Sequence, residues 1–256
     1  MLIIRKEQIK LLDEEMLRRF EDEMVVHLSE FSPPLFRVLG HDQLCDVVRF
    51  GFSKAGAYGF SLRGPIRLYL ELMLLFGSHF DMDPQYPWAA KILNDERSVS
   101  EMQRAEWLHE MTLAYQASVS GAQGLHTNEA LSQLLVTGRN PVTFSAEAFD
   151  ESMKSEMHRV FPQKAAFIGE AALSALIHGG REEAKGYGFP ARGEMLMVVL
   201  KFAFGHGCGN DQLYPWIGRT LRDERMVSST AKADRLERKA MTWLEHVISA
   251  RLKEPK

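Results

Sequence analysis

Cysteine is scarce in this chain, and neither sign of charge dominates it. Among its 256 residues Cys45 and Cys208 are the only cysteines, so neither a disulfide framework nor a four-thiolate zinc site can form. We interpret both as core thiols in a reducing cytoplasm. The 31 basic and 34 acidic residues give a formal charge of −3, so no overall positive field attracts phosphate backbones. Nucleic acid is therefore not an expected partner.

Long apolar runs are also missing. The two most apolar stretches, residues 66–76 and 195–204, carry Arg67, Glu71 or Lys201 and are well below the roughly 20 apolar residues that span a bilayer. The start of the chain turns charged at once, which is not typical of a signal peptide. We therefore expect a cytoplasmic protein that does not bind membranes and buries these stretches as helices.

What the sequence does contain is an internal repeat. The motif Tyr-Gly-Phe-x-x-Arg-Gly that begins at Tyr58 returns at Tyr187, an offset of 129 residues (187 minus 58). The motif Tyr-Pro-Trp at Tyr86 returns at Tyr214, an offset of 128 (214 minus 86). One residue is thus missing from the second copy. Because a deletion inside an α-helix rotates the following residues by about 100°, we place it at a helix end within residues 193–204.

The repeat predicts two homologous units, residues 1–118 and 144–256, joined by a linker at 119–143. Two such units can pack about a pseudo-two-fold axis, as the subunits of a homodimer do. A catalytic set has to exist only once, whereas residues that recur in both copies serve the fold of each unit. The repeat therefore favours a binding protein over an enzyme.

Apolar spacing predicts an all-α protein with about five helices in each unit. The first helix carries one apolar stripe and ends before Pro33-Pro34, the third opens at Gly64-Pro65, and the linker holds a short helix at 129–135. No alternation of β-branched residues indicates a sheet. The stripe of the first helix consists of Ile9, Leu12, Met16, Phe20, Met24, Leu28 and Phe31.

The other helices of the first unit are predicted from turn and capping signals. We expect a second helix at 42–57, closed by Gly59 in a left-handed conformation, and a short helix at 88–93. The last helix is expected to start near Ser98, because Glu101 three residues later has the spacing of a capping box.

Histidine and cysteine offer little support for catalysis. None of the nine histidines has a histidine at the equivalent position of the other unit, which excludes an enzyme with two equal sites. His206 and Cys208 form a local cluster that suggests a thiolate nucleophile or a metal site. Cys208 aligns with Phe80, however, which favours a packing role. The glycines match no phosphate-binding loop, and we expect no cofactor.

Recurring charged and aromatic loop residues are the candidates for contact with a partner. Arg63 and Arg192 each precede an apolar helix, where an arginine most often fastens its loop to carbonyls or to an acid such as Asp95 or Asp223. Asp83, before a proline, fits an N-cap or an Asx-turn. Aromatic residues beside arginines are loop anchors or interface hot spots. The partner-binding candidates are Tyr58, Phe60, Arg63, Asp83, Tyr86, Trp88, Tyr187, Phe189, Arg192, Asp211, Tyr214 and Trp216.

Taken together, several of these motifs resemble a family of helical bacterial proteins whose genes tend to lie beside type VI secretion spike and PAAR-tip toxin genes. The second unit departs from the pattern at Gly207-Cys208-Gly209. The resemblance implies an accessory protein without catalytic residues. It rests on Phe20 and Met24, Tyr58-Gly59, Leu72-Met73 to Phe76-Gly77, Phe80-Asp81-x-Asp83-Pro84 and Pro87-Trp88-Ala89.

The sequence supports three functional hypotheses. The first is a non-enzymatic adaptor or co-chaperone for a secreted antibacterial toxin, with the toxin, another effector or a spike component as its protein partner. The second is an immunity protein that inhibits a cognate toxin. The third, in a different class, is a hydrolase or metal enzyme that uses Cys208 and His206. The sequence leaves open the oligomeric state and the unit that binds.

Overall fold

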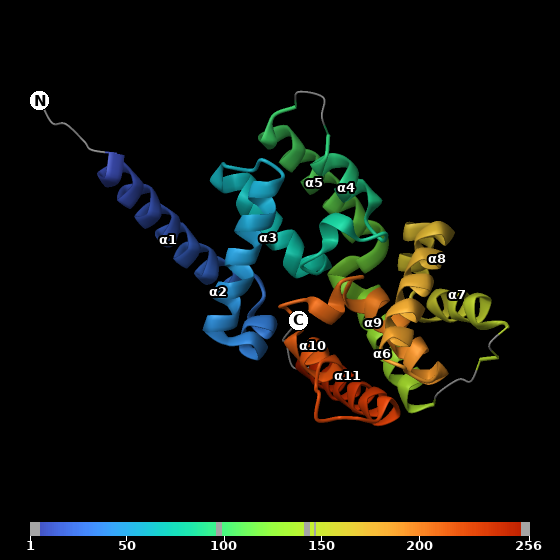
Figure 1. The fold of residues 1–256 in the computed structure, drawn as a ribbon. Helices are drawn as coiled ribbons and strands as arrows, with labels where there is room; N and C mark the ends of the chain where they lie inside the picture. Colours follow the sequence, from blue (N-terminus) through green and yellow to red (C-terminus); the bar gives the residue numbers. More distant parts are fainter. Residues whose placement is uncertain (1–5, 96–98, 141–143, 146, 252–256) are drawn as a thin grey trace, which may run out of the picture.

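A computed structural model describes residues 6–95, 99–140, 144–145 and 147–251. All regular structure in this part is helical, and no strand forms there, which confirms the all-α prediction (Figure 1). The helices are α1 (Lys6–Phe31), α2 (Pro33–Ala57), α3 (Arg63–Phe76), η1 (Phe80–Met82), α4 (Pro87–Leu93), α5 (Glu101–Tyr115), η2 (Gln116–Ser120), η3 (Ala122–Gly124), α6 (Leu125–Arg139), α7 (Phe149–Val160), α8 (Pro162–Gly186), α9 (Ala191–Phe204), η4 (Cys208–Asn210), α10 (Pro215–Leu221) and α11 (Ser229–Arg251).

Helix α1 uses only part of its predicted apolar stripe for packing. It contacts α2 and α3 through its C-terminal half, while its N-terminal half extends beyond the other helices (Figure 1). Met16 is accordingly 67% exposed, and Phe31 is 41% exposed at the helix end. The side chains of Ile9 and Leu12 lie outside the described part of the chain. The buried members of the stripe are Phe20, Met24 and Leu28.

The second helix of each half is kinked at a glycine. Helix α2 consists of two helical stretches separated by Gly40, whose φ of 76° and ψ of 174° are not helical, and the stretch after Gly40 confirms the predicted helix at 42–57. Helix α8 has the same length and bends at Gly169 with a φ of 79°. Positive φ suits glycine because it lacks a Cβ atom. Gly59, also with positive φ, follows α2 as predicted.

The predicted capping box at the last helix of the first half is wrong. Ser98 lies outside the described residues, and the N-cap of α5 is Ser100, whose Oγ accepts from Gln103 N at 3.2 Å. Glu101 instead accepts hydrogen bonds from Ser61 N at 2.7 Å and Leu62 N at 2.9 Å. The carboxylate therefore fixes the loop before α3 rather than the start of its own helix.

The predicted linker contains a longer helix than expected. Helix α6 spans Leu125–Arg139 and packs against α11 and α7. Gly138 allows a close approach, since a Cβ atom there would lie 2.3 Å from Met241 Sδ. Arg139 pairs with Glu245 of α11 at 2.8 Å. Helix α6 is thus part of the packed body and borders the last helix.

The offset changes from 129 to 128 in a loop and not within residues 193–204. Two residues separate Phe60 from α3, but only Pro190 separates Phe189 from α9. Helices α3 and α9 have the same length of 14 residues. We call residues counterparts when they are related by 129 before this loop and by 128 after it. Buried counterparts in the two helices include Tyr69 and Met197, Leu72 and Leu200, and Phe76 and Phe204.

The apolar core runs through both halves. The core of the first half includes Leu213 of the second half, and Phe161, Phe167 and Tyr214 pack against it. The predicted apolar stretches lie in α3 and α9 and are largely buried. None of the described helices combines the length and apolar character needed to cross a bilayer.

Candidate functional site

The structure separates the predicted contact residues into three groups by exposure. Only Arg63 and Arg192 have exposed side chains, at 63% and 48%. Tyr58, Trp88, Tyr187, Tyr214 and Trp216 are half-buried. The buried group is corrected from surface to core, because its members reach no exposed face: Phe60, Asp83, Tyr86, Phe189 and Asp211.

The buried aromatic residues form one cluster in each half. Phe76 lies 4.6 Å from Tyr86 and 5.0 Å from Tyr115, measured between ring centroids. Phe204 lies 4.4 Å from Tyr214 and 4.7 Å from Trp243, which are the counterparts of those tyrosines. Edge-on packing of such rings stabilises a core beyond the area that it buries. The recurring Tyr-Pro-Trp motif therefore anchors α4 and α10 to the rest of each half.

Two buried carboxylates join the halves crosswise. Asp211 accepts from Ser78 N at 2.8 Å and from Ser78 Oγ at 2.6 Å. Asp83, its counterpart, accepts from the N–H of His206 at 2.7 Å, and His206 is the counterpart of Ser78. Such an exchange, in which one residue contacts another and its counterpart returns the contact, is the pattern of an interface with two-fold symmetry.

Each carboxylate also holds its own loop. Asp83 accepts from Gln85 N at 2.9 Å and Asp211 accepts from Leu213 N at 2.8 Å, which confirms the predicted Asx-turn. Burial opposes ionisation of Asp83, but hydrogen bonds from His206 and Gln85 outweigh it and lower the pKa of this carboxyl. Both aspartates are thus structural groups at the junction of the halves.

Glycines let the two backbones meet at this junction. Gly77 and Gly205 end α3 and α9 with φ values of 96° and 95°. A Cβ atom on Gly77 would lie 2.7 Å from Phe204 O, and one on Gly205 would lie 3.1 Å from Phe76 O. Only residues without a side chain fit at this distance and at this φ.

Each half also contains a partly buried ion pair, and one counterpart position in these pairs is a lysine in the first half and a glutamate in the second. In the first half, Lys54 Nζ lies 2.6 Å from Asp81 Oδ2. Glu183, the counterpart of Lys54, lies 2.6 Å from Lys201 Nζ in the second half. Gly209 replaces Asp81, and a Cβ atom there would lie 2.5 Å from Glu183 Oε1. A carboxylate therefore fills the same space in both halves, although it comes from a different helix in each.

The loop that contains His206 and Cys208 does not have the chemistry of a reactive thiol. Cys208 is fully buried, and burial raises the pKa of its thiol to about 12, so it is protonated near neutral pH. His206 Nδ1 lies 3.4 Å from Asp83 Oδ2. No group of three or more His, Cys, Asp or Glu side chains within the described residues is placed to hold a metal ion. Cys45, predicted to be buried, is half-buried.

The two recurring arginines bind acids, but not the predicted ones. Arg63 pairs with Glu23 of α1, and its guanidinium lies 4.4 Å from the centre of the Phe20 ring. Arg192 Nε donates to Glu237 Oε2 of α11 at 2.8 Å. Arg192 follows the first residue of α9, whereas Arg63 is the first residue of α3, so the two are not counterparts.

A surface groove of about 800 Å³ lies beside α11 in the second half. Arg192 lines it, and the other predicted contact residues do not. Its walls combine methionine side chains with charged groups and come from α6, α9, α11 and the loop that precedes α11. Its lining residues are Gly138, Arg192, Met226, Ala231, Asp234, Glu237, Arg238, Met241, Thr242 and Glu245.

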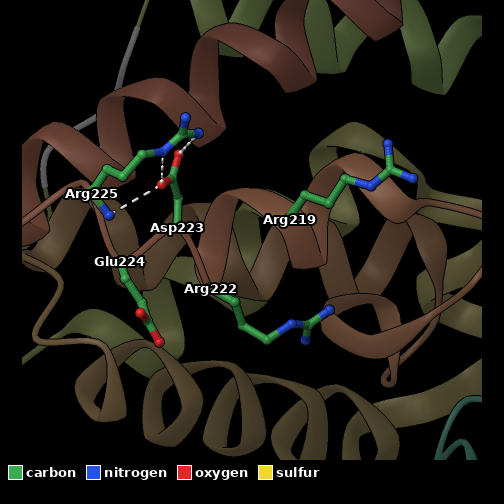
Figure 2. A pocket seen from close by; sticks show the side chains of 5 residues that line it. All are labelled: Arg219, Arg222, Asp223, Glu224 and Arg225. Atoms are coloured by element: carbon green, nitrogen blue, oxygen red, sulfur yellow. Dashed lines mark hydrogen bonds and ion pairs between the residues drawn. The ribbon is translucent and has the colours of Figure 1, made fainter.

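A second, more open depression adjoins this loop at the end of α10. Figure 2 shows Arg219, Arg222, Asp223, Glu224 and Arg225 around it, with the Arg225 side chain turned to Asp223 and the Arg219 side chain directed away from both. Arg225 donates to both oxygens of Asp223, at 2.9 and 3.0 Å. Sequence reasoning named Asp223 only as a possible partner of Arg192 and did not single out the arginines of this region.

Compared with known proteins, the chain matches no family model, no curated protein and no solved structure. The functional argument therefore depends on the residues of this chain.

Proposed function

We propose that this chain is a tandem duplication of one helical unit and acts as a non-enzymatic adaptor or co-chaperone for a secreted antibacterial toxin in the bacterial cytoplasm. The crosswise bonds of Asp83 and Asp211 and the paired glycine kinks support the duplication. The toxin-related partner comes from the family resemblance alone. Binding of another protein by shape and charge is supported by the residues of this chain themselves.

The observation that carries this proposal is the way the polar residues are used. The carboxylates that recur in both halves accept hydrogen bonds across the junction, and Cys208 is buried and protonated. The two carboxylates are therefore committed to structural hydrogen bonds, and the Cys208 thiol is not ionised to act as a nucleophile. The groove beside α11, in contrast, offers methionine side chains with a charged rim on the surface, a composition that suits contact with a polypeptide.

Co-expression with the product of the neighbouring gene tests the proposal. We expect the two proteins to co-purify and the toxin to remain active in the complex. Failure to recover any protein partner would overturn the proposal. Loss of toxin activity at a one-to-one ratio would replace the adaptor by an immunity protein.

A pair of matched variants locates the contact. Thr242 lines the groove and is exposed, and its counterpart Ala114 is an exposed residue of α5. We expect Thr242→Arg to abolish co-purification because the larger cation fills the groove, and Ala114→Arg to leave it unchanged. Equal effects of both variants would show that the groove does not bind the partner.

A further inference from the structure

The second half carries a cluster of cations that the first half lacks. We define the basic cluster as Arg219, Arg225, Arg235 and Lys239, four cations around the C-terminal end of α10, of which Arg225 and Arg235 pair with Asp223. Arg235 Nη1 donates to Asp223 Oδ2 at 3.0 Å, and Lys239 donates to Thr220 Oγ1 at 3.0 Å. The counterparts of these cations in the first half are Lys91, Arg97, Trp107 and Met111.

Two of the four positions therefore carry a cation in the second half and an apolar residue in the first. The helices that hold them, α11 and α5, correspond to each other in the two halves. The aromatic clusters and the hydrogen bonds of the junction match between the halves, although the buried position of Met73 is also taken by a cation, Lys201, in the second half. A structural need for Arg235 and Lys239 is not shared by the first half, where Trp107 and Met111 occupy the same helix face. The charges are thus a property of the second half's surface.

The basic cluster retains free positive charge. Asp223 is bonded by both Arg225 and Arg235, so this carboxylate pairs with two of the four cations. Burial and the nearby Arg235 and Arg219 cations lower the pKa of Lys239, which shows that the positive charges act on one another. Arg219 makes no ion pair within the described part of the chain and is exposed.

We propose that the basic cluster binds an acidic segment of the protein partner. This inference rests on the proposed function and names the chemistry of the docking segment. Asp223 shows that the cluster already accommodates a carboxylate in a two-pronged arginine bond, which is the geometry that guanidinium groups prefer. A carboxylate of the partner would bind, in the same way, the cations that do not pair with Asp223.

The neighbourhood of the cluster favours a polypeptide over a polyanion. Glu224 lies in the same depression and Asp234 lies on the adjacent face of α11, so a continuous phosphate backbone would meet like charges. Val227, in the loop between α10 and α11, is 97% exposed, whereas its counterpart Val99 is half-buried. A segment with both acidic and apolar side chains matches this surface. Met226, next to Val227, also lines the groove beside α11, so one partner can occupy both.

Direct binding of a labelled peptide tests the inference on the full-length chain. The probe is a synthetic peptide of alternating glutamate and leucine, titrated by fluorescence anisotropy at low and high salt. We expect binding that weakens with salt, and a dissociation constant about tenfold or more higher for Arg219→Glu/Lys239→Glu. The control Arg18→Glu/Lys91→Glu changes two exposed cations elsewhere and has the same net charge, so it should bind as the wild type does.

The outcomes separate this inference from the proposed function. Equal peptide binding by the two double variants, or no binding to the wild type, would overturn it. Tighter binding of a single-stranded oligonucleotide of equal charge would do the same. Failure of the neighbouring gene product to co-purify would overturn the proposed function and leave the peptide result standing. Circular dichroism of each variant checks folding, and the single variant Arg219→Glu repeats the test at a side chain with no structural bond.

Discussion

Removal of the Asp211 carboxylate is the sharpest perturbation of the junction between the halves. In Asp211→Ala the two backbone N–H groups of Ser78 and Leu213 lose their acceptor, and both residues are buried. A buried donor left without a partner costs about 1–3 kcal/mol. The expected loss is therefore about 2–6 kcal/mol, a large share of the roughly 5–15 kcal/mol that stabilises a typical protein.

Denaturant unfolding of the full chain, followed by far-ultraviolet circular dichroism, measures this loss. Asp46→Ala is the matched control, because Asp46 is 61% exposed and lies 3.7 Å from Arg49 in a surface pair, which contributes about 0–1 kcal/mol. Asp211→Asn should fall between the two, since one side-chain oxygen still accepts while the amide nitrogen replaces the acceptor of at least one of the three donors. If Asp211→Ala loses no more stability than Asp46→Ala, the crosswise carboxylates do not hold the halves together.

Three further predictions concern buried groups. Burial lowers the pKa of Lys164 from 10.5 to about 8, so the unfolded chain binds more protons than the folded chain between these pH values. The free energy of unfolding should therefore rise across this pH window by up to about 3 kcal/mol. Denaturant titrations at several pH values measure this rise, and Lys164→Met should remove it. Iodoacetamide at pH 8 should leave Cys208 unmodified until denaturant is added, as mass spectrometry would show; rapid native labelling would contradict its burial. Gly77→Ala should destabilise the chain by about 2 kcal/mol or more, because φ is 96° and the new Cβ would lie 2.7 Å from a carbonyl oxygen, whereas Gly64→Ala, with open space around it, should change the melting temperature little.

Local features of the fold were predictable from the sequence because their causes are local. The spacing of apolar residues predicted the helices, and Gly59 predicted the end of α2. The helix that follows Gly40 matches the prediction, but the helical stretch between Pro33 and Gly40 was not predicted, since a glycine inside a helical pattern can either end a helix or kink it. The capping-box prediction failed for a similar reason. Ser98 and Glu101 have the spacing of a capping box, but Glu101 accepts hydrogen bonds from two N–H groups of the loop before α3.

The junction could not be predicted because its partners are far apart in the chain. Asp83 and the N–H of His206 are separated by 123 residues, and only the packing of the halves brings them together. A signal was nevertheless present. Gly77 and Gly205 recur together with Asp83 and Asp211, and a recurring glycine indicates a position that needs a positive φ or a close backbone approach.

An identical residue in two sequence motifs is weaker evidence of a shared role than a residue at the same structural position in both halves. Arg63 and Arg192 look like one recurring charge, but the shortened loop shifts the second by one residue. The position that Arg63 fills, over the ring of Phe20 at 4.4 Å, is filled in the second half by Arg181, over the counterpart ring of Phe149 at 4.4 Å. The core has therefore kept the contact while changing its source. On the surface around α10 and α11 the opposite holds, because the helix positions are the same and the charges differ. Packing explains the first pattern, and the docking of a partner on one half that we propose would explain the second.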